Sequence, residues 1–203
     1  AAAQTPTDAQ FQAVDEIFAE WERNGSPGAA VVVTRNGEVL LRKGYGHANL
    51  DYGIPITPQT LFDIASVSKH FTAFAILLLA DQGRLSLDDD ITKHLQDLPD
   101  FGRPVTIRHL VHHTSGIRDW VELLSIGGYR FDDVISLPDI RTFIAGQRGL
   151  NFEPGAEHLY SNTGYNLLAE IVASVSGQPF ARFMKQSIFD PLDMHDTHIL
   201  TDH

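Results

Sequence analysis

Two short segments of the sequence carry side chains that can do chemistry. In the first, Ser66-Val67-Ser68-Lys69, a hydroxyl and an amine lie three positions apart at the start of an apolar run. Residues at i and i+3 share one face of a helix, so the two groups can touch. A neutral amine there can take the serine proton. The first turn of a helix also offers backbone N–H groups to a developing oxyanion.

The Ser-x-x-Lys spacing is too short a pattern to identify an active site by itself. The alternative is that Ser66 caps the helix and Lys69 is a solvated residue of its first turn. The second segment, Tyr160-Ser161-Asn162, follows Pro154-Gly155 and precedes Gly164, which predicts an exposed turn between two elements. Tyr160 could relay a proton there, and Asn162 could hold an amide of the substrate.

The elements that position these residues follow from hydrophobic periodicity and turn residues. The runs at 29–34 and 38–42 are joined through Asn36-Gly37, a pair typical of a type I′ turn, and predict a β-hairpin. Apolar spacing and capping residues predict helices at 7–23, 66–82, 106–112, 138–147, 164–176 and 179–188. Residues 117–137, with aromatic side chains among glycines, predict a long irregular loop that could form a binding surface.

Composition limits the partners. The chain has 15 basic and 26 acidic residues, a net charge of −11, and no run of Lys or Arg, which argues against a nucleic-acid partner. The longest apolar stretch, residues 71–80, is too short to span a membrane. The chain contains no Cys, which removes disulfides and thiolate chemistry. The opening Ala1-Ala2-Ala3 resembles a mature chain after signal cleavage, so we expect a periplasmic or secreted protein.

Longer motifs around both segments resemble the β-lactamase-related serine hydrolases, which include class C β-lactamases, D-aminopeptidases, DD-peptidases and esterases. The similarity runs in family order through nearly the whole chain. The matching segments are residues 62–69 with Phe71-Thr72, 83–89, 107–116, 154–155, 160–165 and 191–194. One position departs from the family pattern, because Asp193 stands where Gly is frequent.

The resemblance implies a role for each candidate residue. Ser66 would be the acylated nucleophile, Lys69 its proton acceptor, Tyr160 the general base or proton relay, and Asn162 a contact to a substrate amide. The fold class implied is α/β (α+β) of the β-lactamase/transpeptidase type. Residues 1–60 would supply an N-terminal helix and the hairpin of an antiparallel sheet, and residues 61–203 a mostly helical region. The whole span 1–203 would be one hydrolase domain, incomplete at its C-terminus.

The third motif of the family, a Lys-Thr-Gly or His-x-Gly strand, has no match in the sequence. A hairpin alone would leave an apolar face and an unpaired strand edge. We therefore expect a complementing C-terminal segment of the same protein, which would supply the remaining strands of the sheet.

Other interpretations remain open at this stage. His109, His112 and His113 could share a metal ion, as in a His-ligated metallohydrolase, although no Glu lies in a His-Glu-x-x-His pattern. A non-catalytic binding or scaffold protein with the same fold is a second alternative. Ser115 and Ser161 are rival nucleophiles, but neither is followed by Lys at the required spacing.

The function that the sequence favours is hydrolysis of an ester or amide through an acyl-enzyme on Ser66. The substrate would be a small molecule or a peptide: a β-lactam, a D-amino-acid peptide or a simple ester. Such a reaction requires no metal or organic cofactor.

Overall fold

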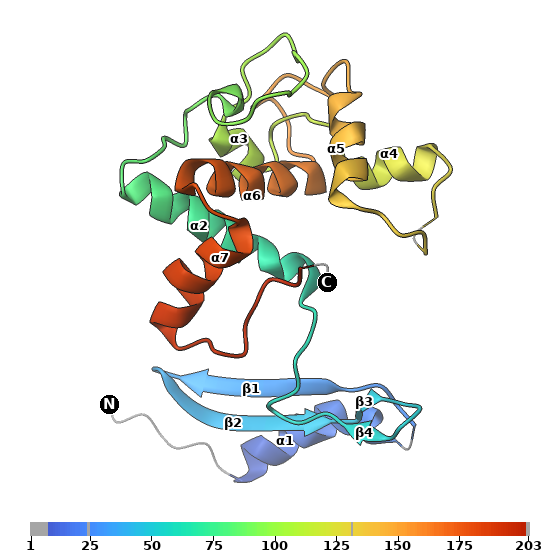
Figure 1. Ribbon diagram of the computed structural model, residues 1–203. Helices are drawn as coiled ribbons and strands as arrows, with labels where there is room; N and C mark the ends of the chain where they lie inside the picture. Colours follow the sequence, from blue (N-terminus) through green and yellow to red (C-terminus); the bar gives the residue numbers. More distant parts are fainter. Residues whose placement is uncertain (1–7, 24, 131, 202–203) are drawn as a thin grey trace. The chain divides into compact units, whose positions relative to one another are not determined.

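A computed structural model describes residues 8–23, 25–130 and 132–201 (Figure 1). The chain divides into two compact units, Ala1–Asp63 and Ile64–His203. The sequence predicts that residues 1–203 form one hydrolase domain that is incomplete at its C-terminus. This stays a prediction. No helix within the described residues is long and apolar enough to cross a membrane.

The first unit contains a helix and a hairpin. Its elements are α1 (Asp8–Phe18), the 3₁₀ turn η1 (Ala19–Glu22), β1 (Ala29–Arg35), β2 (Glu38–Tyr45), β3 (His47–Asn49) and β4 (Ile54–Pro55). Strands β1 and β2 pair antiparallel and β3 pairs with β4, so each sheet of the described residues has two strands. Asn36 and Gly37 both have positive φ, 51° and 83°, as a type I′ turn requires, and the predicted hairpin is confirmed.

Helix α1 is fixed to the hairpin by one carboxylate and one ring contact. Asp15 accepts hydrogen bonds from Lys43 Nζ at 2.6 Å and from the Tyr45 hydroxyl at 2.7 Å. The Phe18 ring stacks on the Tyr45 ring at 5.0 Å between centroids. The helix predicted over residues 7–23 is therefore present from Asp8 to Phe18 and changes to a 3₁₀ turn after that, while Thr7 lies outside the described residues.

The second unit is helical. Its elements are η2 (Ala65–Ser68), α2 (Lys69–Asp81), η3 (Ile91–Lys93), α3 (Ile107–Val111), α4 (Trp120–Ile126), α5 (Leu137–Ala145), α6 (Asn162–Ser176), α7 (Phe180–Met184), the π-helical turn η4 (Lys185–Phe189) and η5 (Asp190–Leu192). Helices α2 and α6 pack together at its centre (Figure 1). Their fully buried residues include Ile76, Leu79, Leu168 and Ile171, so the core lies between these two helices.

Two sequence predictions need correction in this unit. The segment 117–137 is not wholly irregular, because α4 occupies its first part and is capped by Asp119, whose side chain accepts the Val121 N–H. The predicted helix over 66–82 is α-helical only from Lys69. Ala65 has a φ of 45°, so the chain enters this element through a left-handed residue and a 3₁₀ turn rather than a regular helical one.

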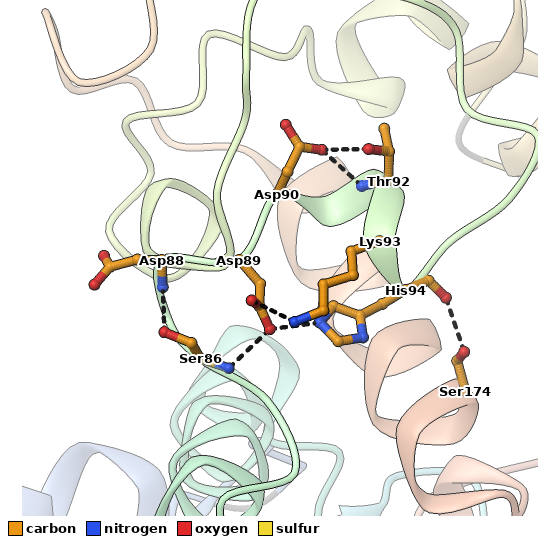
Figure 2. Close-up of polar contacts among 8 residues, drawn as sticks. All are labelled: Ser86, Asp88, Asp89, Asp90, Thr92, Lys93, His94 and Ser174. Atoms are coloured by element: carbon orange, nitrogen blue, oxygen red, sulfur yellow. Dashed lines mark hydrogen bonds and ion pairs between the residues drawn. The ribbon is translucent and has the colours of Figure 1, made fainter.

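A polar cluster around Asp89 holds the loop between α2 and α3 (Figure 2). Asp89 accepts hydrogen bonds from Lys93 Nζ at 2.7 Å, from the Ser86 N–H at 2.9 Å and from His94 Nε2 at 2.9 Å. The Ser174 hydroxyl of α6 donates to the His94 carbonyl at 2.8 Å. The Asp89 carboxylate thus fixes the turn at 86–94, and the separate bond between Ser174 and the His94 carbonyl attaches this turn to α6.

Candidate active site

The Ser66 hydroxyl lies between two other polar side chains. Lys69 Nζ donates a hydrogen bond to Ser66 Oγ at 3.1 Å, and the Tyr160 hydroxyl donates to the same oxygen at 2.7 Å. The contact expected from the Ser-x-x-Lys spacing is present, although η2 rather than an α-helix provides it. The turn segment with Tyr160 arrives at the same oxygen from 94 residues further along the chain.

Lys69 is not a solvated first-turn residue. Besides Ser66, its Nζ donates to Asn162 Oδ1 at 2.9 Å. It also lies 4.7 Å from the centroid of the Tyr160 ring and 5.6 Å from that of Tyr165, over the aromatic faces. The alternative that Ser66 caps the helix is wrong as well, because Ser68 is the residue before α2 and no side-chain cap forms there.

Tyr160 is held beside Ser66 by a stack of rings. Its ring centroid lies 4.7 Å from that of His113, and His113 lies 5.1 Å from Tyr165. Burial acts to raise the pKa of Tyr160, but hydrogen bonds with Lys69 and Ser66 and the charge of Lys69 outweigh burial and lower that pKa. A phenol with a lowered pKa gives up its proton more readily, which suits a proton relay.

His113 also fixes the backbone next to Tyr160. Its Nδ1 accepts the Ser161 N–H at 3.1 Å, which fixes the residue between Tyr160 and Asn162. Burial, together with neighbouring His158 and Lys69, lowers the pKa of His113, so the ring is neutral at neutral pH. The sequence drew attention to this histidine as a possible metal ligand but did not connect it with Tyr160.

Asn162 begins α6 rather than lying in the turn before it, because Ser161 is the N-cap and accepts the Gly164 N–H. Its side chain spans the site. Asn162 Oδ1 accepts from Lys69, and its Nδ2 donates to Asp119 Oδ2 at 2.9 Å. Asp119 was not among the residues singled out from the sequence, since a lone Asp before Trp120 signals only a helix cap.

The rival residues have structural roles. Ser115 is buried and its hydroxyl accepts the Ile117 N–H, and Ser161 is the buried cap of α6. His109 forms a capping box with Thr106 at the start of α3. Within residues 8–23, 25–130 and 132–201, no group of three or more His, Asp or Glu side chains is placed to hold a metal ion.

The fold of this chain is similar to that of proteins of known structure. A penicillin-binding protein from Bacillus halodurans superposes with a TM-score of 0.77 at 30% identity, covering 92% of this chain and 56% of its own. The Beta-lactamase family model matches residues 12–202. The chain therefore belongs to the Beta-lactamase family, as its motifs predicted.

Two curated relatives are longer than the part of them that this chain matches. A D-aminopeptidase of Gluconobacter oxydans (strain 621H) is 38% identical over 168 residues, which is 83% of this chain and 31% of the relative. Protein flp of Staphylococcus aureus (strain N315) is 34% identical over 204 residues, which is 94% of this chain and 39% of the relative. The chain thus spans between three and four tenths of these relatives' length.

Proposed function

We propose that this protein is a serine hydrolase that forms an acyl-enzyme on Ser66. The observation that carries the proposal is the position of Ser66 Oγ, which has Lys69 Nζ at 3.1 Å and the Tyr160 hydroxyl at 2.7 Å. Both neighbours can exchange a proton with the serine, and the Ser66 residue is exposed, so a substrate carbonyl can reach it.

The reaction proceeds in two steps. In the first, Lys69 or Tyr160 takes the Ser66 proton, Oγ forms a bond to the carbonyl carbon, and the leaving alcohol or amine departs with a proton returned from the same pair. In the second, water attacks the acyl-serine, gives up a proton to Tyr160 or Lys69, and the acid leaves as Oγ regains its proton. The Ser66 N–H lies in the first turn of η2, where helical N–H groups have no intrahelical acceptor, and serves the oxyanion.

The substrate class in this proposal is an ester or amide of a small molecule or peptide: a β-lactam, a D-amino-acid peptide or a simple ester. The names of a D-aminopeptidase and a penicillin-binding protein among the similar proteins support the first two. We assign Asn162, whose Oδ1 accepts from Lys69 and whose Nδ2 donates to Asp119, the contact to a substrate amide in this proposal.

We further propose that strands from outside these 203 residues complete the sheet of the first unit. The two-stranded pairing of β1 with β2 and the greater length of the relatives support this. Size-exclusion chromatography and calorimetry test it. A monomeric 203-residue chain with a single cooperative melting transition would contradict the need for such a segment.

Mass spectrometry tests the acyl-enzyme directly. The intact protein is exposed to a fluorophosphonate and, separately, to a penicillin, with Ser66→Ala as the control. We expect one adduct, located on the peptide that contains Ser66, and none in the variant. An adduct on another residue, or no adduct with either reagent, would show that the protein is a binding module or uses different chemistry.

A further inference from the structure

Asp119 is a buried carboxylate behind the candidate active site. Only 5% of the residue is exposed. Its Oδ1 accepts the Val121 N–H at 2.8 Å, which caps α4. Its Oδ2 accepts two hydrogen bonds from one residue, the backbone N–H of Asn162 at 2.6 Å and Asn162 Nδ2 at 2.9 Å.

These bonds decide which way the Asn162 amide points. An amide side chain has a donor end and an acceptor end, whereas an ionised carboxylate only accepts. The Nδ2 end must therefore face Asp119, which leaves Oδ1 facing Lys69 Nζ at 2.9 Å. In the reverse orientation Oδ1 would meet the carboxylate and Nδ2 would meet the lysine, with no hydrogen bond at either end.

The orientation matters because Lys69 needs an acceptor on this side. Its Nζ is held between Asn162 Oδ1 and Ser66 Oγ. We propose that Asp119 is a positioning residue, which acts through the Asn162 amide to hold Lys69 against Ser66. This inference rests on the proposed acyl transfer at Ser66. Among its described contacts, Asp119 forms no hydrogen bond with Ser66 or Lys69.

The variant Asp119→Asn tests the role with the least change of shape. An Asn at 119 can still accept the Val121 N–H, but its own NH₂ then faces the two donors of Asn162. The bond that holds Asn162 Nδ2 away from Lys69 is lost, and only the lysine still favours the orientation that points Oδ1 at it. Single-turnover acylation by the simple ester p-nitrophenyl butyrate, which has no amide, is the readout. We expect the maximal rate constant to fall about 100-fold while the half-saturating concentration stays the same.

Asp90→Asn is the matched control. Asp90 caps η3 as Asp119 caps α4, and its Oδ1 accepts from the Thr92 N–H at 2.8 Å and the Thr92 hydroxyl at 2.6 Å (Figure 2). It has no bond to Asn162 or Lys69 among its described contacts. We expect its acylation rate to match the wild type, so that a loss confined to Asp119→Asn is not a general effect of an Asp→Asn change at a helix cap.

A double-mutant cycle separates positioning from a general structural effect. On an Asn162→Ala background, Asp119→Asn should cause no further loss of rate. Losses that multiply in the double variant, or a wild-type rate in Asp119→Asn, would overturn the proposal. If circular dichroism shows that Asp119→Asn is unfolded, Asp119→Ser, which retains a capping hydroxyl, takes its place with the same expectation.

The side-chain NH₂ resonances of Asn162 in ¹⁵N-labelled protein provide a readout that does not depend on acylation. In the wild type they should be shifted by the carboxylate bond and slow to exchange, and Asp119→Asn should remove both properties. Wild-type protein that shows this signature but is never acylated would count against the proposed function alone. Resonances unchanged by the substitution would count against the positioning role alone.

Discussion

The helical unit contains two polar clusters that are each built around a mostly buried carboxylate, and only one of them ends in a reactive group. In the cluster of Asp89, all three hydrogen bonds to the carboxylate come from residues 86–94 (Figure 2). This cluster is closed, in the sense that the bonds to its carboxylate hold one loop and lead to no reactive group. In the cluster of Asp119, the chain of contacts continues through Asn162 and Lys69 to Ser66, which is exposed.

The backbone shows the same difference. Ala65 and His113, both beside the candidate site, have positive φ, 45° and 56°, whereas no described residue from 86 to 94 does. Left-handed backbone costs an L-residue free energy and persists only where the surroundings enforce it. A closed cluster that stabilises a loop and a strained, open cluster that presents a hydroxyl are therefore distinguishable from geometry alone.

Lys69→Met should break the open cluster most severely. The substitution keeps most of the length of the side chain and removes the amine that bonds Ser66 and Asn162. We expect acylation to fall by about 10² to 10⁴, the usual contribution of a general base. The rate of fluorophosphonate labelling, in which the same hydroxyl is phosphonylated and fluoride leaves, measures how far the reactivity of Ser66 falls. Labelling of the variant at the wild-type rate would leave Tyr160 as the sole proton acceptor.

The pH dependence of acylation tests whether Tyr160 takes the proton of Ser66. Because the pKa of Tyr160 is lowered from its ordinary value near 10, acylation that uses the phenolate should rise with pH and level off below that value. Tyr160→Phe should lose this rise and about 100-fold of the rate. A profile that is identical in wild type and variant would assign the proton transfer to Lys69.

Much of this arrangement was predictable from sequence, and the failures have physical causes. Ser66, Lys69, Tyr160 and Asn162 meet as predicted because helical spacing and the family motifs both constrain them. The catalytic and binding roles assigned to them, and the expected export, stay predictions.

Two features were missed because they depend on tertiary contacts. Helix α4 is short and lies in a segment whose glycines and aromatic residues are typical of loops, so local propensity did not indicate it. The second role of Asp119 depends on Asn162, a residue 43 positions away, and sequence spacing carries no information about such a contact.

Asp89→Asn should lower the unfolding free energy and leave the acylation rate unchanged. Hydrogen bonds from Lys93, the Ser86 backbone and His94 lower the pKa of Asp89 well below its usual range. The stabilisation is therefore complete above the unfolded-state value near 4 and is lost as the pH falls below it. We expect the variant to lose about 2 kcal/mol of unfolding free energy at pH 7, measured by urea denaturation, and to be less sensitive to acid.

Asp88→Asn provides the comparison for this measurement. Asp88 is the neighbouring carboxylate, but its side chain is 71% exposed and pairs with Arg108 on the surface. Exposed ion pairs contribute little, so we expect a clearly smaller loss of stability than in Asp89→Asn. Equal losses in the two variants would mean that the closed cluster around Asp89 adds nothing beyond a surface pair. Acylation should be unchanged in both.

Ala65→Gly should have the smallest effect and the opposite sign. At a φ of 45° alanine pays a steric cost that glycine avoids, and this exceeds the extra backbone entropy of glycine in the unfolded chain, so we expect a gain of about 0.5 kcal/mol. The same change at Ala73, within α2, should instead cost about 1 kcal/mol. If strain at residue 65 holds Ser66 in place, the more stable Ala65→Gly protein should acylate more slowly. A variant that gains stability and keeps the full rate would show that the left-handed turn is a feature of the fold only.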